Sequence, residues 1–254
     1  MGRLEGKVAV ITGAGSGIAR SATRIFTREG ARVVVAEIDR EKGEAAAAEA
    51  GDNAVFVHTD VTDEASVETL MSTAVERFGG LHVLFNSAGG SVIEDTIVTE
   101  VDLTVWNETI PRDLKGPFLC SRFGIPHLIA SGGGSVVNVS SVVALRGNHP
   151  AHVYSAAKGG LISFTRSLAG AYSDEGVRAN VICPGLIKTE RVKARYVARK
   201  PNSSRKGTVD VFQSYPFGVG EPEDIANIAL FLASDESRMV NGAVIPAEGG
   251  ISAY

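Results

Sequence analysis

The sequence predicts an α/β fold built on one doubly wound parallel sheet with helices on both faces. Apolar runs of strand length alternate with helical segments of ten or more residues along the chain, which is the pattern of βαβ crossovers. Glycines follow directly after the first of these runs, where an open sheet places a phosphate-binding turn. A closed eight-fold β/α barrel would show the same alternation, and the position of the glycines favours the open sheet.

Seven short runs rich in β-branched residues are expected to form strands, most of them buried on both faces. They span residues 7–12, 31–37, 54–59, 81–86, 135–140, 177–183 and 243–247. The helices expected between them span about 17–29, 41–50, 63–78, 102–130, 152–173 and 223–234. Pro111 predicts an irregularity inside the fourth helix, because proline lacks the N–H that an α-helix needs.

Composition narrows the class of protein. The chain has 254 residues, 29 of them Gly, and a net charge of −4. It shows no linker or internal repeat, so we expect residues 1–254 to form one domain. The mild acidity argues against nucleic acid as a partner, and the isolated Cys120 and Cys183 indicate neither a disulfide framework nor a metal site. Without an apolar run of about 18 residues or a signal peptide, we expect a cytoplasmic protein that binds no membrane.

The glycine-rich turn after the first strand reads TGAGSGIA over residues 12–19. Its glycines, Gly13, Gly15 and Gly17, would let backbone N–H groups approach a phosphate at a helix N-terminus, with Ser16 and Ile18 in the same turn. The spacing differs from the G-x-G-x-x-G of two-domain dehydrogenases. By itself the turn is also compatible with a tight strand-to-helix connection that binds nothing.

An acidic residue at the end of the second strand supports a dinucleotide site. Glu37 lies 20 residues after Gly17, and a carboxylate at that distance can accept hydrogen bonds from the adenosine ribose hydroxyls. It would repel the 2′-phosphate of NADP, and no basic residue stands at Ser16 or Ile38 to offset that repulsion. We therefore predict NAD in preference to NADP, the alternative being that Glu37 is only an exposed strand end.

Three residues further along the chain have the chemistry of acid–base catalysis. Tyr154 and Lys158 are four residues apart and share one face of a helix. The ammonium group would stabilise the phenolate form of the tyrosine and make it a usable acid–base group near neutral pH. Ser141 follows the fifth strand, where open α/β sheets bind ligands, and its hydroxyl could polarise a substrate carbonyl.

With these motifs together, the chain resembles the short-chain dehydrogenase/reductase family, which has a Rossmann-like fold, and the resemblance runs essentially end to end. It rests on the glycine turn, on NSAG at 86–89, on the spacing of Ser141, Tyr154 and Lys158, and on PGLIKT at 184–189. FLAS and EGG near the C-terminus add to it. Each motif is weak alone, and the combination is specific.

The resemblance implies an oxidoreductase that moves a hydride between a nicotinamide and a secondary alcohol or ketone. Tyr154 would be the general acid or base, Lys158 would assist it and bind the nicotinamide ribose, and Ser141 would bind the substrate oxygen with Tyr154. The other residues implied in cofactor binding are Asp60, Val61, Asn86, Ala88, Gly89, Pro184, Gly185, Ile187 and Thr189. The family also implies a homodimer or homotetramer, and the small residues Ala156, Ala157, Gly159 and Gly160 would allow close helix packing.

One position departs from the family pattern. The fourth helix usually carries an asparagine whose backbone carbonyl holds a proton-relay water, and here Asp113 stands in its place. A backbone role survives this exchange, whereas the added negative charge would perturb the relay. Asp113 is therefore either a retained catalytic residue or a sign of weakened catalysis.

A basic segment marks the expected substrate lid, residues 188–217. Within it, residues 188–206 carry eight Lys or Arg and one Glu, a local charge of +7. This charge suggests an anionic substrate, although a solvated amphipathic helix would have the same composition. The rival to an enzyme is a non-catalytic NAD-binding regulator on the same fold, which only Asp113 favours. A cofactor-free lyase would need a spoiled glycine turn, and the turn is intact.

Overall fold

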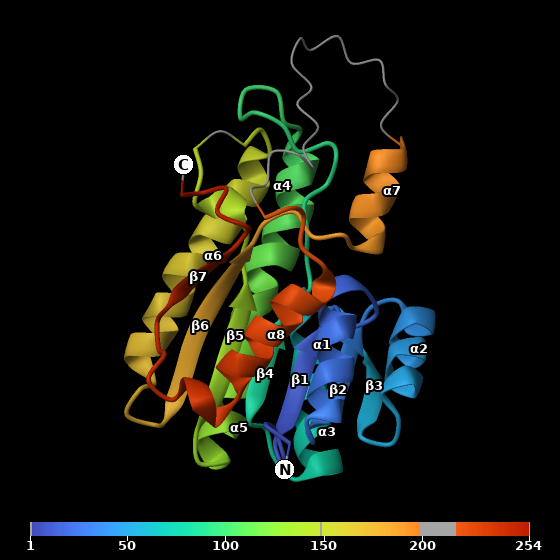
Figure 1. Cartoon of the computed structure of the whole chain (residues 1–254), viewed down its shortest axis with the longest axis vertical. Helices are drawn as coiled ribbons and strands as arrows, with labels where there is room; N and C mark the ends of the chain where they lie inside the picture. The colour runs from blue at the N-terminus through green and yellow to red at the C-terminus, as the bar shows by residue number, and fades with distance from the viewer. Residues whose placement is uncertain (1, 148, 199–216, 254) are drawn as a thin grey trace.

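The computed structural model describes residues 2–147, 149–198 and 217–253. It contains one parallel sheet of seven strands in the order β3-β2-β1-β4-β5-β6-β7, flanked by helices (Figure 1). The strands are β1 (Val8–Thr12), β2 (Arg32–Glu37), β3 (Ala54–His58), β4 (Val83–Asn86), β5 (Gly134–Val139), β6 (Val177–Pro184) and β7 (Val244–Ala247). The predicted doubly wound sheet is confirmed, and the barrel alternative is wrong because β3 and β7 are open edges.

The helices lie between the strands as the alternation predicts. They are α1 (Gly17–Arg28), α2 (Arg40–Ala50), α3 (Glu64–Phe78), α4 (Leu103–Ile110), α5 (Gly116–Ala130), α6 (His152–Ala171), α7 (Glu190–Ala198) and α8 (Pro222–Ala233). The bounds of α1, α2, α3, α6 and α8 agree with the predicted ranges to within a few residues. The predicted helix 102–130 is divided into α4 and α5, and α7 is not among the predicted helices. The predicted lid, 188–217, falls partly on α7 and otherwise mostly outside the described residues.

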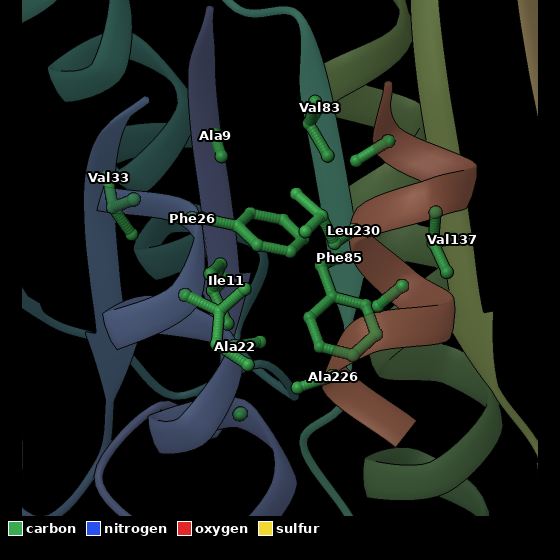
Figure 2. Packing of buried hydrophobic residues seen from close by; sticks show 14 of the residues in the cluster. Ala9, Ile11, Ala22, Phe26, Val33, Val83, Phe85, Val137, Ala226 and Leu230 are labelled. Atoms are coloured by element: carbon green, nitrogen blue, oxygen red, sulfur yellow. The ribbon is translucent and has the colours of Figure 1, made fainter. Parts of the chain in front are cut away.

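Two hydrophobic clusters hold the helices against the two faces of the sheet. Ile11 of β1 packs with Phe26 of α1 and Leu230 of α8, as Figure 2 shows. Its neighbour Val10 belongs to the other cluster, with residues of α3 and α5. Because successive strand side chains point to opposite faces, a run such as VAVIT must be apolar throughout to fill both clusters.

The irregularity that Pro111 predicts is a one-turn π-helix, Pro111–Lys115, between α4 and α5. Such turns widen the helix by one residue and are frequent at functional sites. This one places Asp113 fully inside the protein. No helix in the described part of the chain is long and apolar enough to cross a membrane.

The strand order reverses between β1 and β4, which pair in parallel in the centre of the sheet. In open α/β sheets, ligands bind beyond the carboxyl ends of the strands at this reversal. The turns after β1, β4, β5 and β6 therefore open at one end of the sheet, and they carry most of the predicted site residues.

Candidate active site

The glycine turn packs tightly against three other residues of the predicted cofactor site. A Cβ at Gly13 would lie 2.8 Å from Ala88 Cα, one at Gly15 would lie 2.8 Å from a Glu37 oxygen, and one at Gly17 would lie 2.9 Å from the Thr189 methyl group. Gly13 and Gly17 also have positive φ angles, +70° and +54°. The glycines thus bring the ends of β2, β4 and β6 together, in addition to leaving a phosphate room.

A cleft of about 530 Å³ lies at this junction. Ten of the predicted cofactor-binding residues line it, together with residues of α4 and α7. The ten are Gly13, Ser16, Gly17, Ile18, Glu37, Asp60, Val61, Ala88, Gly89 and Thr189. The cleft passes the start of α1, at the strand-order reversal where open α/β sheets bind ligands. Ser141, Tyr154 and Lys158 are not among its lining residues.

The start of α1 suits an anionic group. The Ser16 side chain makes no capping hydrogen bond, and the first turn of α1 contains no acidic residue. The first backbone N–H groups of a helix have no partner within the helix and carry a partial positive charge. The residues present therefore fit a dinucleotide phosphate at this place.

Glu37 lies at the opposite wall of the cleft. Its Oε2 accepts a hydrogen bond from the Gly15 N–H at 2.9 Å, and its Oε1 accepts from Ile38 and Asp39. The residue is partly exposed at the end of β2. The carboxylate is therefore held against the glycine turn rather than extended into solvent, and Arg40, on α2, is exposed.

The predicted catalytic residues meet at the ends of β5 and α6. Lys158 is 4% exposed, its Nζ lies 5.6 Å from the centre of the Tyr154 ring, and it donates to the Val139 carbonyl at 3.0 Å. Ser141 is 9% exposed and accepts a hydrogen bond from the Val143 N–H at 3.4 Å. The Ser140 hydroxyl, directly after β5, donates to the Lys158 carbonyl and so holds α6 against the end of this strand.

The side chain of Asp113 contacts Lys158, one of these predicted catalytic residues. Its Oδ1 lies 3.1 Å from Lys158 Nζ and accepts from the Gly90 N–H at 2.8 Å, and its Oδ2 accepts from Arg112 Nε at 2.9 Å. Burial opposes its ionisation, but the ammonium of Lys158 and the guanidinium of Arg112 outweigh burial and hold the pKa of Asp113 below its usual value. The carboxylate is therefore charged and compensated inside the protein.

The glycine pair after β4 makes room for these charged groups. A Cβ at Gly89 would collide with the Asp113 carboxylate, and one at Gly90 would collide with the Arg191 guanidinium. Both glycines have φ near +137°. Their Cβ positions are thus filled by protein side chains, a use that the sequence alone did not reveal.

Asp95 is a residue that sequence reasoning missed. It is 7% exposed, and its two oxygens accept from the N–H groups of Val153 and Tyr154 at 3.2 and 2.8 Å. The helix cap itself, Ala151, has no side-chain oxygen to do this. Asp95 therefore caps α6 from a loop 59 residues earlier than Tyr154, and no local pattern could have indicated the pairing.

The remaining predicted cofactor residues lie nearby but do not line the cleft. Asn86 is buried and donates from Nδ2 to Asn138, the Ile187 side chain packs in the core, and the Gly185 N–H donates to Ala247. Pro184 ends β6 and is also buried. For Ile187, whose side chain packs in the core, only the backbone remains for a cofactor. The Asn86 Oδ1 is buried and has no hydrogen-bond partner among the described residues.

Comparison with known proteins agrees with this geometry. A family model described as enoyl-(acyl carrier protein) reductase matches residues 13–252. The chain is 38% identical over 254 residues to meso-2,3-butanediol dehydrogenase of Serratia marcescens, covering 99% of this chain and 96% of the relative. It is 38% identical over 250 residues to cis-4-hydroxycyclohexanecarboxylate dehydrogenase of Sinomonas cyclohexanicum, covering 97% of each.

A crystal structure described as a short-chain dehydrogenase/reductase from Burkholderia xenovorans superimposes with a TM-score of 0.91. The two chains are 33% identical, and the match covers 100% of this chain and 99% of the other. The chain therefore belongs to the short-chain dehydrogenase/reductase family and is an oxidoreductase of that type. The family implies a nicotinamide cofactor, and the cleft and the start of α1 fit one.

Proposed function

We propose that this protein is an NAD-dependent dehydrogenase or reductase that interconverts a secondary alcohol and a ketone. The observation that carries the proposal is the buried Lys158 ammonium, 5.6 Å from the Tyr154 ring on the same helix, at the sheet end where the dinucleotide cleft opens. Lysine and tyrosine four residues apart share one helix face, and an ammonium group close to a phenol can assist its proton transfer. This is the arrangement that a tyrosine acid–base catalyst needs.

The chain's residues divide the chemistry between binding and proton transfer. A bound nicotinamide supplies the hydride acceptor or donor. Ser141 accepts a hydrogen bond from Val143 and can donate its own hydroxyl hydrogen to the substrate oxygen. The Tyr154 hydroxyl takes the proton from the alcohol, or gives it to the ketone, while the Lys158 ammonium stabilises the ionised tyrosine.

Asp113 is proposed to act on Lys158 rather than on the substrate. Its carboxylate lies 3.1 Å from Lys158 Nζ and is nowhere exposed. Together with the hydrogen bond to the Val139 carbonyl at 3.0 Å, this contact fixes the position of the ammonium. We therefore favour a retained role in catalysis over the interpretation that Asp113 marks an inactive protein.

The preference for NAD over NADP rests on Glu37. Its carboxylate is held at the rim of the cleft by Gly15 and by the backbone after β2, where it can accept hydrogen bonds from ribose hydroxyls. A 2′-phosphate at the same place would meet a like charge at short range. The other residues that we propose to hold the cofactor are those lining the cleft, together with Asn86 and the backbone of Pro184, Gly185 and Ile187.

We propose that the substrate is a small secondary alcohol or its ketone. The proposed class includes substrates that carry a negative charge. Two relatives are named for a butanediol and for a hydroxycyclohexanecarboxylate, so both neutral and acidic alcohols occur among similar proteins. The charge of +7 over residues 188–206 supports the anionic class. Comparing kcat/KM for acidic and neutral alcohols over a range of salt concentrations tests this, and equal, flat responses would contradict it.

We propose that the protein forms a homodimer or homotetramer, with an interface between subunits at the outer faces of α5 and α6. Phe118 of α5 is 46% exposed and packs its ring 5.6 Å from that of Phe164 on α6. A Cβ at Gly159 would meet nothing within 4 Å, so the surface of α6 is open there, whereas Gly160 packs on Leu114. An exposed Phe118 packed on the half-buried Phe164, beside a small-residue surface, is suited to close helix packing.

The direct test is reduction of NAD with a panel of secondary alcohols, followed by absorbance of the reduced nicotinamide. Tyr154→Phe removes only the hydroxyl and is expected to lower kcat at least about 100-fold, with NADH affinity unchanged. If the wild type binds NADH but converts no member of a broad panel of alcohols and ketones, the non-catalytic regulator interpretation gains support.

A further inference from the structure

Arg191 places an unneutralised cation at the phosphate end of the cofactor cleft. It lies in the first turn of α7, two residues after Thr189, and both residues line the cleft. Its Nη1 donates to the Gly89 carbonyl at 2.7 Å, and its guanidinium occupies the space that a Cβ at Gly90 would need. The side chain therefore points back from the lid toward the end of β4.

The charges around Arg191 distinguish it from the other cations nearby. Arg112, which also lines the cleft, pairs with Asp113 at 2.9 Å, and Lys188 pairs with Glu221 at 2.5 Å. Arg191 has no carboxylate partner among the described residues. A neutral carbonyl is a weaker partner for a guanidinium than an anion is, so this contact can be exchanged at little cost.

The opposite side of the cleft carries partial positive charge as well. The Thr189 methyl group lies against Gly17 at the start of α1, where the side chain of Ser16 makes no capping bond and the first turn contains no acidic residue. The start of α1 and the Arg191 guanidinium thus border one space, lined by Gly13, Ser16 and Gly17. Of the three carboxylates that line the cleft, Glu37, Asp60 and Glu108, the first two accept hydrogen bonds from backbone N–H groups. Two positive groups that border one space fit a diphosphate.

We infer that Arg191 binds the diphosphate of the dinucleotide, exchanging its hydrogen bond to Gly89 for a charge-assisted bond to phosphate oxygens. The inference rests on the proposed nucleotide cofactor. It assigns one of the eight basic residues of 188–206 to the cofactor rather than to an anionic substrate. It also implies that the bound diphosphate contacts the first turn of α7, where Arg191 lies.

Calorimetric titration with ADP and with adenosine tests the inference without any substrate. ADP carries the diphosphate, and adenosine offers the same base and ribose without it. Arg191→Ala is expected to weaken the binding of ADP and NADH about tenfold, since it removes a charge-assisted hydrogen bond at a solvent-exposed position. Adenosine affinity should stay within about twofold, and Arg191→Lys should recover part of the loss for ADP.

Lys193→Ala is the matched control, because it removes the same charge from an exposed position of the same helix, outside the cleft lining. Its affinity for ADP should equal that of the wild type. Equal losses for ADP and adenosine in Arg191→Ala, or no loss for either, would overturn the inference. If the wild type binds neither ADP nor NADH, the proposed cofactor itself fails, which is a different outcome.

Discussion

The Asp113 carboxylate lies 3.1 Å from Nζ of Lys158, and both side chains are almost completely withdrawn from water, at 0% and 5% exposure. Arg112 and the Gly90 N–H occupy the remaining sides of the carboxylate. The aspartate that replaces the family's usual asparagine is thus not a bare added charge. Its counterion, Arg112, lies one residue earlier in the sequence.

Asp113→Asn should destabilise the protein strongly near neutral pH and much less in acid. The pKa of Asp113 is held below its usual value, so the ionised form stabilises the fold above about pH 4, and that contribution is lost as the pH falls through the folded-state pKa. Leaving Lys158 and Arg112 without their carboxylate is expected to cost about 3 kcal/mol. Urea unfolding at several pH values measures the difference.

Asp39→Asn is the control for that measurement. The pKa of Asp39 is also lowered, by hydrogen bonding to Lys42, but its side chain is on the surface. Its effect on unfolding should be far smaller, because water screens an exposed pair. Equal effects of the two substitutions, or a loss in Asp113→Asn that does not vary with pH, would contradict the buried ion pair.

Asp95→Ala should reduce both stability and turnover. It removes the acceptors for the first-turn N–H groups of Val153 and Tyr154, which we expect to cost about 1–2 kcal/mol. It also frees the helix turn that carries Tyr154, so kcat should fall at least roughly tenfold. Unfolding curves and steady-state kinetics report the two effects separately.

Asp102→Ala offers a comparison with the same chemistry elsewhere. Asp102 caps α4 by accepting from the Thr104 N–H at 2.8 Å, and it touches neither α6 nor the cleft lining. It should lower stability without the loss of kcat. A similar loss of kcat in both variants would mean that capping acts only through global stability.

Gly13→Ala should abolish cofactor binding, because its Cβ would meet the Ala88 backbone at 2.8 Å in a residue with φ of +70°. Gly79→Ala is the control. Gly79 has φ of +85° at the end of α3, and its added Cβ would meet nothing within 4 Å. Both substitutions carry backbone strain of order 1 kcal/mol, but only Gly13→Ala should raise the Kd for NADH. Normal NADH binding by Gly13→Ala would show that the turn does not shape the site.

Glu37→Ala should raise the kcat/KM for NADP relative to that for NAD at least about tenfold, because it removes the charge that opposes a 2′-phosphate. Glu41→Ala removes the same charge from an exposed position in the first turn of α2 and should leave the ratio unchanged. An unaltered ratio in Glu37→Ala would place the origin of cofactor preference elsewhere.

The sequence was sufficient for the parts of this molecule that depend on local pattern. The alternation of apolar runs with helices predicts the parallel sheet, and Pro111 predicts the break that proves to be a π-helix. The glycine turn and the spacing of Tyr154 and Lys158 bring the predicted residues to one end of the sheet, because each follows a strand or lies on one helix face.

The parts that the sequence could not predict depend on contacts between distant segments. Asp95 caps a helix 58 and 59 residues away, and Arg191 reaches Gly89 across 102 residues. An isolated Asp or Arg carries no signal of its partner. Asp113 shows the same limit in another form, because its position in the family pattern suggested a backbone role, whereas its side chain makes the contacts that matter here.

The loop around Asp95 is hydrogen-bonded to the first turn of α6, so amide exchange in that turn reports whether the loop is in place. The His152 N–H donates to the Thr96 carbonyl, and the Val98 N–H donates to His152, in addition to the two bonds of Asp95. First-turn amides of a helix normally exchange with solvent quickly, since no carbonyl precedes them. In this protein those of residues 152–154 should exchange slowly, and only when the loop detaches. Their deuterium uptake would therefore measure how often the loop beside Tyr154 opens.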